Sequence, residues 1–212
     1  MQIINNAIEK YADQMSTPVD ALLDELEKET YQKVLQPNML SGSYQGQLLS
    51  IISKIKNPSA ILEIGTYTGY STICLAQGLK KNGVVHTIEI NEELKSIQDK
   101  YFKKCKLENS IRQHLGNAKD IIPQLSDKFD LLFIDADKKN YKNYLDATYH
   151  LLNPGALVLT DNVLWKGKVV EPDQRDKMAN YLHEFNQYLA DHKGFSTILL
   201  PVRDGLSLSI KN

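Results

Sequence analysis

The sequence has few of the features that mark secreted, membrane-spanning or metal-finger proteins. Its only two cysteines, Cys74 and Cys105, form no C-x-x-C pair and have no histidine partners at zinc spacing. This usage favours a reducing compartment over a disulfide framework. No apolar run approaches the roughly 20 residues of a transmembrane helix, and the first residues lack the long apolar core of a signal peptide. We therefore expect a cytoplasmic protein without a membrane partner.

An excess of charge of one sign is also missing. The 212 residues contain 25 Lys and Arg against 26 Asp and Glu, which gives a formal net charge of −1. This balance carries no electrostatic signature of bulk nucleic-acid or anionic-membrane binding. With 42% hydrophobic and 24% charged residues, the composition is typical of a folded globular protein. At roughly 150 residues per domain, the length predicts a single domain over residues 1–212, with a helical N-terminal cap (1–57) and a core (58–212).

Short apolar segments alternate with helical segments from about residue 58 onwards. The first five expected strands are rich in Ile, Leu or Val and are Ala60–Ile64, Val84–Ile90, Ile111–Leu115, Leu131–Ile134 and Ala156–Thr160. They do not alternate cleanly with polar residues, which is typical of strands that are covered on both faces. Helices are expected between them, over Ser71–Lys81, Glu92–Leu107, Lys119–Leu125 and Tyr141–Leu152. The alternation predicts an α/β, Rossmann-like, doubly wound parallel sheet.

The C-terminal part departs from this alternation. A helix is expected over Pro172–His192, followed by strands at Thr197–Leu200 and Leu206–Ile210. Only Pro201–Gly205 separates the two strands, which is hairpin length and too short for a crossover helix. We therefore predict a seven-stranded sheet whose last strand is antiparallel. Amphipathic N-terminal helices around Ile3–Asp13, Pro18–Val34 and Tyr44–Ile55 are expected to cap it.

Residues at the ends of the first three expected strands suggest an adenosine cofactor. Ligands of open parallel sheets bind beyond the carboxyl ends of the strands. Gly65 and Gly69 follow the first strand, and glycines there allow a sharp turn and close approach of a ligand. Glu89 stands where a carboxylate can accept both ribose hydroxyls, and Ala118 could touch the adenine. A plain tight turn and a solvated strand-end Glu are the simpler interpretations of each feature alone, and the pattern does not distinguish NAD from S-adenosylmethionine.

Oxygen donors follow the next two strands. Asp135 ends the fourth, and Asp161 with Asn162 ends the fifth. Three oxygen ligands without His or Cys suit a hard cation such as magnesium, although strand-end caps and turn residues would explain each alone. Lys138 lies within reach of the same pocket, and a cation beside it would disfavour the ammonium form and make the amine a possible base.

Five segments together resemble the class I S-adenosylmethionine-dependent O-methyltransferases of the cation-dependent catechol and caffeoyl-CoA type. They are M-L-S-G-S-Y-Q-G-Q-L-L, E-I-G-T-Y-T-G-Y-S, I-D-A-D-K, T-D-N-V-L-W-K-G and P-V-R-D-G-L, and the resemblance runs from about Met39 to Leu208. It implies S-adenosylmethionine and a divalent cation, magnesium, as cofactors. Arg203 departs from the pattern, because many members have Gly there.

The resemblance also implies the roles of individual residues. Lys138 and Asp135 would be catalytic, and the metal ligands would be Asp135, Asp161 and Asn162. Trp165 and Tyr67 are candidate walls for a flat ring. The contacts with the cofactor would come from Ser41, Glu63, Gly65, Thr66, Tyr67, Ser71, Glu89, Ala118 and Asp135.

The function implied is methyl transfer to a hydroxyl of a small catechol-like vicinal diol, by a homodimer. One alternative of the same fold is a tRNA hydroxyuridine O-methyltransferase. The balanced net charge speaks against a large basic face for tRNA, although phosphate contacts could come from Lys166, Lys168, Arg175 and Lys177. An NAD-dependent oxidoreductase would explain Gly65 and Glu89 but not the oxygen donors. A non-catalytic cofactor-binding protein would leave the complete metal set without a purpose.

Overall fold

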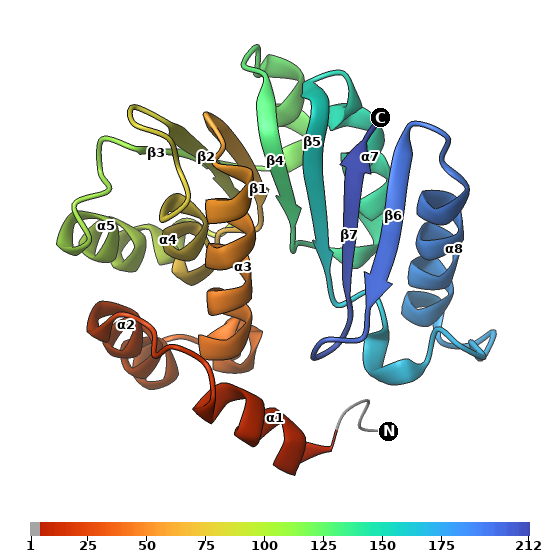
Figure 1. Cartoon of the computed structure of the whole chain (residues 1–212), viewed down its shortest axis with the longest axis horizontal. Helices are drawn as coiled ribbons and strands as arrows, with labels where there is room; N and C mark the ends of the chain where they lie inside the picture. Colours follow the sequence, from red (N-terminus) through yellow and green to blue (C-terminus); the bar gives the residue numbers. More distant parts are fainter. Residues whose placement is uncertain (1–4) are drawn as a thin grey trace.

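A seven-stranded sheet forms the centre of the structure, a computed structural model that describes residues 5–212 (Figure 1). The strands lie in the order β3-β2-β1-β4-β5-β7-β6. Every neighbouring pair is parallel except those of β7, which runs antiparallel to both β5 and β6. The predicted Rossmann-like sheet with an antiparallel last strand is confirmed. The strands are β1 (Ala60–Ile64), β2 (Val84–Glu89), β3 (Ile111–Leu115), β4 (Phe129–Ile134), β5 (Leu152–Asp161), β6 (Phe195–Leu200) and β7 (Leu206–Lys211).

Helices cover both faces of the sheet because successive residues of a strand point to opposite sides. On one face, Leu62 and Ile64 of β1 share a hydrophobic core with Tyr141 and Leu182. On the other face, Ile61 of β1 belongs to a second core. Burial of all five residues of β1 follows from this double cover. The core helices are α4 (Tyr70–Ala76), α5 (Lys95–Lys104), α6 (Ala118–Ile121), α7 (Tyr141–Tyr149) and α8 (Lys177–Asp191).

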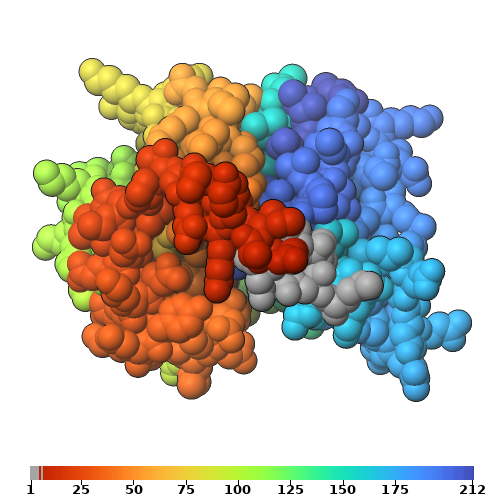
Figure 2. Space-filling view, turned by 60° about the horizontal axis from the view of Figure 1, so that its bottom comes forward, coloured from red at the N-terminus to blue at the C-terminus, as the bar shows by residue number. Residues whose placement is uncertain are grey.

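The second and third of the three N-terminal helices pack on the second of these faces, and the first contacts the third. The three helices are α1 (Asn6–Gln14), α2 (Ala21–Lys33) and α3 (Gly42–Lys56); the first residues of the helix expected over Ile3–Asp13 lie outside the described residues. Leu23 and Leu26 of α2 and Leu49 of α3 are buried in the same core as Ile61. Figure 2 shows the red and orange N-terminal helices beside the cyan and blue C-terminal segments. Within residues 5–212, no helix is long and apolar enough to cross a membrane.

Several element boundaries differ from those expected, each for a local reason. The helix expected from Pro172 begins only at Lys177, because the side chain of Asp176 accepts a hydrogen bond from the Ala179 N–H and caps the helix there. The helix expected over Lys119–Leu125 is divided into α6 and a 3₁₀ turn, Ile122–Gln124, with a proline near its start. The strand expected from Ala156 begins at Leu152, with a register shift against β4 between Phe129 and Leu131.

Candidate active site

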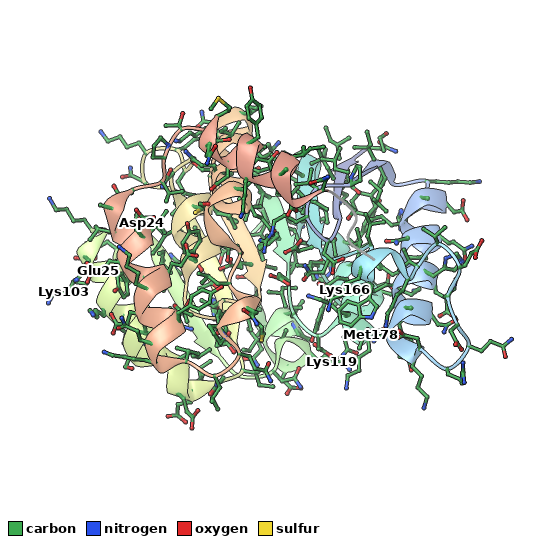
Figure 3. All side chains as sticks on the ribbon, turned by 90° about the horizontal axis from the view of Figure 1, so that it is seen from below. Asp24, Glu25, Lys103, Lys119, Lys166 and Met178 are labelled. Carbon is green, nitrogen blue, oxygen red and sulfur yellow. The ribbon has the colours of Figure 1, made fainter. Side chains whose placement is uncertain are left out.

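A cavity of about 780 Å³ lies beyond the carboxyl ends of β1, β2, β4 and β5. The strand order reverses between β1 and β4, which is where open α/β sheets bind their ligands. Figure 3 views the molecule from this side and shows Lys119 and Lys166 there, well away from Asp24 and Glu25. The cavity is lined by residues that include Met39, Gly65, Tyr67, Glu89, Ala118, Lys119, Asp135, Lys138, Asn162, Trp165 and Asp204.

The glycine loop after β1 is required by close contacts within the fold. Gly65 has a φ of +103°, and a Cβ there would come within 2.0 Å of the Asp135 carbonyl oxygen. The backbones at the ends of β1 and β4 are therefore in close contact, and only glycine fits. Gly69 (φ +92°) precedes α4, where a Cβ would meet the ring of Phe102. Both glycines are needed by the fold, so their presence alone does not require a ligand.

Glu89 is held against the cavity by backbone donors. Its Oε2 accepts a hydrogen bond from the Tyr67 N–H at 2.7 Å, and its Oε1 accepts one from the Asn91 N–H at 2.8 Å. A carboxylate has about four acceptor sites, so both oxygens can still accept hydrogen bonds from a ligand. The hydroxyl of Tyr67 donates in turn to the carbonyls of Leu35 and Gln36, which ties this wall of the cavity to the segment between α2 and α3.

Three of the predicted cofactor contacts lie behind the glycine loop. Glu63 is fully buried and accepts hydrogen bonds from the hydroxyls of Ser71, Thr72 and Thr87. Burial raises the pKa of this carboxyl to about 7, against the lowering effect of its three donors. Thr66 hydrogen-bonds to Thr87 at 2.5 Å. Glu63, Thr66 and Ser71 therefore form a polar cluster that supports the loop and do not line the cavity.

The fourth predicted contact that does not line this cavity is Ser41. It lines a separate cavity of about 440 Å³ together with Arg203 and residues of α1 and α2. The structure thus brings Gly65, Tyr67, Glu89, Ala118 and Asp135 together in the lining of one cavity. Direct contact of Ser41, Glu63, Thr66 and Ser71 with a cofactor remains a prediction.

The predicted metal ligands lie at the ends of β4 and β5, where Asp135 and Asn162 line the cavity and Asp161 is buried behind its lining. Asp161 is 3% exposed. Its Oδ1 accepts a hydrogen bond from the Asn162 N–H at 2.8 Å, and its Oδ2 accepts one from the Gln45 amide at 2.5 Å. Burial, together with the negative charge of Asp135, raises the pKa of Asp161 to about 6. Lys138 Nζ lies 2.7 Å from Asp135 Oδ1 in an ion pair.

The donor set fits a hard cation. Asp135 and Asp161 repel each other, and a divalent cation shared by both would relieve this repulsion. Within the described chain, no three His, Cys, Asp or Glu side chains are arranged to hold a metal. The ligands that the resemblance implies are two carboxylates and the amide oxygen of Asn162, with water or substrate oxygens in the remaining positions. Lys138 would then lose its ion pair with Asp135, and its amine would no longer be engaged by that carboxylate.

Sequence reasoning missed two residues of this site. Gln45 touches Asp161 from 116 positions away, and Asp204 lines the cavity from the turn before β7. Periodicity and strand-end position carry no signal for Gln45, because it lies within α3. Its contact depends on how α3 packs against the sheet.

Comparison with known proteins agrees with the geometry. A model of the O-methyltransferase family matches residues 13–212. The chain is 33% identical over 175 residues to a catechol O-methyltransferase of Niastella koreensis, covering 78% of this chain and 79% of that protein. It is also 33% identical over 182 residues to caffeoyl-CoA O-methyltransferase 2 of Petunia hybrida, covering 80% and 75%.

Solved structures resemble the whole chain. The O-methyltransferase from Bacillus cereus in complex with SAH has a TM-score of 0.89 and 29% identity, covering 97% of each chain. The O-methyltransferase TomG from Streptomyces achromogenes in complex with SAM has a TM-score of 0.88 and 28% identity, covering 98% of this chain and 96% of that one.

Proposed function

The chain belongs to the O-methyltransferase family, and from this membership we propose that it methylates one hydroxyl of a catechol-like vicinal diol with the help of a divalent cation. It is an S-adenosylmethionine-dependent O-methyltransferase. The proposed cation is magnesium, and its ligands would be Asp135, Asp161 and Asn162. The NAD-dependent oxidoreductase is set aside, because this family transfers methyl groups.

The observation that carries the proposal is the joining of two kinds of residues in one cavity. Gly65 and Glu89 line it on the side of β1 and β2, while Asp135 and Asn162 line it at the ends of β4 and β5. The first pair suits an adenosine group and the second suits a cation with its oxygen ligands. One cavity of about 780 Å³ is large enough for both a cofactor and a small acceptor.

Glu89 is the proposed anchor of the cofactor. Its carboxylate is already oriented by the N–H groups of Tyr67 and Asn91, so binding the two ribose hydroxyls would cost little reorganisation. Ala118 is small and buried on the same wall, where it leaves room for the flat adenine. S-adenosylmethionine supplies the methyl group as a sulfonium, which needs only an aligned oxygen nucleophile.

Lys138 and Asp135 are the proposed catalytic residues. A cation held at Asp135 and Asp161 would lower the pKa of the acceptor diol. Lys138 lines the same cavity, and its amine would take the acceptor proton at Nζ. As the oxygen–carbon bond forms, the sulfur–carbon bond breaks, and the proton stays with Lys138. Trp165 lines the same cavity as Asn162 and is the proposed wall for the aromatic ring.

The tRNA alternative is weakened by ion pairs at two of its four expected phosphate contacts. Lys168 Nζ lies 2.7 Å from Asp176, and the Arg175 guanidinium lies 2.8 Å from Asp173. The Lys168 and Arg175 side chains thus each already have an acidic neighbour that a phosphate group would have to displace. This favours a small acceptor over a polyanion.

The expected homodimer and the cytoplasmic location also remain proposals. Sedimentation equilibrium of the full chain tests the first, with a mass twice that of the 24.1 kDa protomer as the expected result. A monomer at micromolar concentration would contradict it.

A methyl-transfer screen tests the proposed function. Labelled S-adenosylmethionine is offered with catechols, with their CoA esters and with tRNA, each with and without magnesium. Label should pass to a catechol-type acceptor only when magnesium is present. Transfer to tRNA alone, with a steep loss as salt increases, would instead support the alternative.

A further inference from the structure

The buried amide of Gln45 links Asp161 to Arg203. Gln45 is 3% exposed. Its Nε2 donates to Asp161 Oδ2 at 2.5 Å, and its Oε1 accepts from Arg203 Nη1 at 2.7 Å. The three residues come from α3, from the end of β5 and from the turn between β6 and β7. This Arg203–Gln45–Asp161 chain therefore joins three segments that are distant in sequence.

The charges of Asp161 and Arg203 determine the orientation of the Gln45 amide. A carboxylate can only accept hydrogen bonds and a guanidinium can only donate them, so the Gln45 NH₂ must face Asp161 and its carbonyl must face Arg203. Both bonds involve a charged group, which makes them stronger than neutral ones. Neither a carboxylate nor an aliphatic side chain at position 45 could make both bonds.

The hydrogen bonds from Arg203 through Gln45 restrict the orientation of the Asp161 side chain. The Asn162 N–H already holds Oδ1, and the Tyr141 hydroxyl donates to the Asp161 carbonyl at 2.9 Å. With the Gln45 amide on Oδ2, the plane of the carboxylate is determined while each oxygen keeps a lone pair. Hydrogen bonds of this kind around a ligating carboxylate orient it toward a metal.

Arg203 has an unusual backbone conformation, and its guanidinium makes a second hydrogen bond. Its φ is +51°, in the left-handed region that disfavours residues other than glycine. Its Nη1 also donates to the carbonyl of Ser41, directly before α3. The guanidinium therefore holds the start of α3, and with it Gln45, against the β6–β7 turn.

We propose that Gln45 and Arg203 are positioning residues for the cation site, with Gln45 orienting Asp161 and Arg203 acting through Gln45. The inference rests on the proposed function, because it presupposes that Asp161 binds a cation. Neither residue touches the substrate or the cofactor in this scheme. Their effect should appear in the affinity for the cation, independently of turnover.

The test measures Mn²⁺ binding to the full chain by the loss of the free-ion electron paramagnetic resonance signal. Gln45→Leu should weaken Mn²⁺ binding about tenfold or more, as is typical for outer-shell partners of metal ligands. Arg203→Gly should weaken it less, since Gln45 keeps its bond to Asp161. The double variant should match Gln45→Leu alone, because the side-chain hydrogen bonds of Arg203 reach Asp161 through Gln45.

Matched controls separate positioning from general damage. Gln47→Leu lies two positions further along the same helix, where the amide donates only to the exposed Thr17 carbonyl, and it should keep wild-type Mn²⁺ affinity. The affinity of Gln45→Leu for S-adenosylmethionine should also be unchanged. Should Gln45→Leu fail to fold, Arg203→Gly carries the test, because glycine suits the left-handed turn.

The outcomes distinguish this inference from the proposed function. If the wild type does not bind Mn²⁺, the cation site itself is wrong, and the inference falls with it. If the wild type binds Mn²⁺ and a folded Gln45→Leu variant binds it equally well, the inference alone is overturned. Additive losses in the double variant would overturn the claim that Arg203 acts through Gln45.

Discussion

The two halves of the cavity are held in place by different means. On the cofactor half, Glu89 is oriented by backbone N–H groups that lie 22 and 2 positions away in the sequence. On the cation half, Asp161 depends on the side chain of Gln45, 116 positions away, and Gln45 meets Arg203 across 158 positions. The first half is built by a strand and its neighbouring loops, and the second is built by tertiary packing. Substitutions in the two halves should therefore have separable effects.

The largest expected effect comes from Asp161→Ala on the cation half. Turnover should fall roughly a thousandfold, because a bound cation contributes several kcal/mol to stabilising developing charge. Affinity for S-adenosylmethionine should remain close to that of the wild type, as measured by isothermal titration calorimetry. A parallel loss of cofactor affinity would show that the two halves are not independent.

Lys138→Ala should have a smaller effect on the same half. We expect turnover to fall about a hundredfold, the lower end for general acid–base catalysis, because the cation already favours ionisation of the acceptor. Lys142→Ala, an exposed lysine paired with Asp146, is the matched control and should retain activity. A loss for Lys138→Ala as large as that for Asp161→Ala would mean that proton removal by Lys138 dominates.

Glu89→Gln tests the cofactor half. The affinity for S-adenosylmethionine should fall about tenfold to a hundredfold, because hydrogen bonds to a charged group contribute about 1.5–3 kcal/mol. Mn²⁺ affinity should not change, and the exposed neighbour Glu92 provides the control Glu92→Gln. Equal cofactor affinity in wild type and Glu89→Gln would remove Glu89 from the binding site.

The last prediction concerns the stability of the fold, not activity, and the buried Glu63. Burial raises the pKa of Glu63 from its ordinary value of 4.5 to about 7, so between these pH values the folded state binds more protons than the unfolded state. The free energy of unfolding should therefore decrease as pH rises through this window, by at most about 3 kcal/mol from this group.

Urea denaturation of wild type and Glu63→Gln from pH 5 to pH 8 measures this contribution. Subtracting the two curves cancels other groups, such as His86, whose pKa burial lowers to about 4. The stability of the variant relative to wild type should increase with pH. A difference that does not change with pH would contradict the account of Glu63.

The distinction between local contacts and contacts of distant segments also explains which parts of the site could be predicted from the sequence. Apolar runs in the sequence predict the ends of β1 and β4, and those of β2 and β5 to within one residue, because the sheet buries these strands on both faces. Neighbouring strands then place Asp135 and Asp161 side by side without further information. The insertion of β7 between β5 and β6 was not predicted, since a hairpin length specifies antiparallel pairing but not which strand takes the edge.

Contacts between distant segments could not be predicted in the same way. Gln45 has no strand-end position, and its contact with Asp161 exists only because α3 packs against the sheet. The family resemblance predicts that Ser41 and Glu63 contact the cofactor, whereas the structure places Ser41 in a separate cavity and Glu63 beneath the glycine loop. Whether such residues line the cavity depends on where their side chains point once the helices and strands have packed.

The central claim is that a cation held by Asp135, Asp161 and Asn162 is needed for methyl transfer to a vicinal diol. Its most direct test is the rate of label transfer from S-adenosylmethionine to a simple catechol in excess EDTA, before and after magnesium is added back in excess of the chelator. We predict no transfer above background in EDTA and full recovery with magnesium. Undiminished transfer in EDTA would contradict the claim.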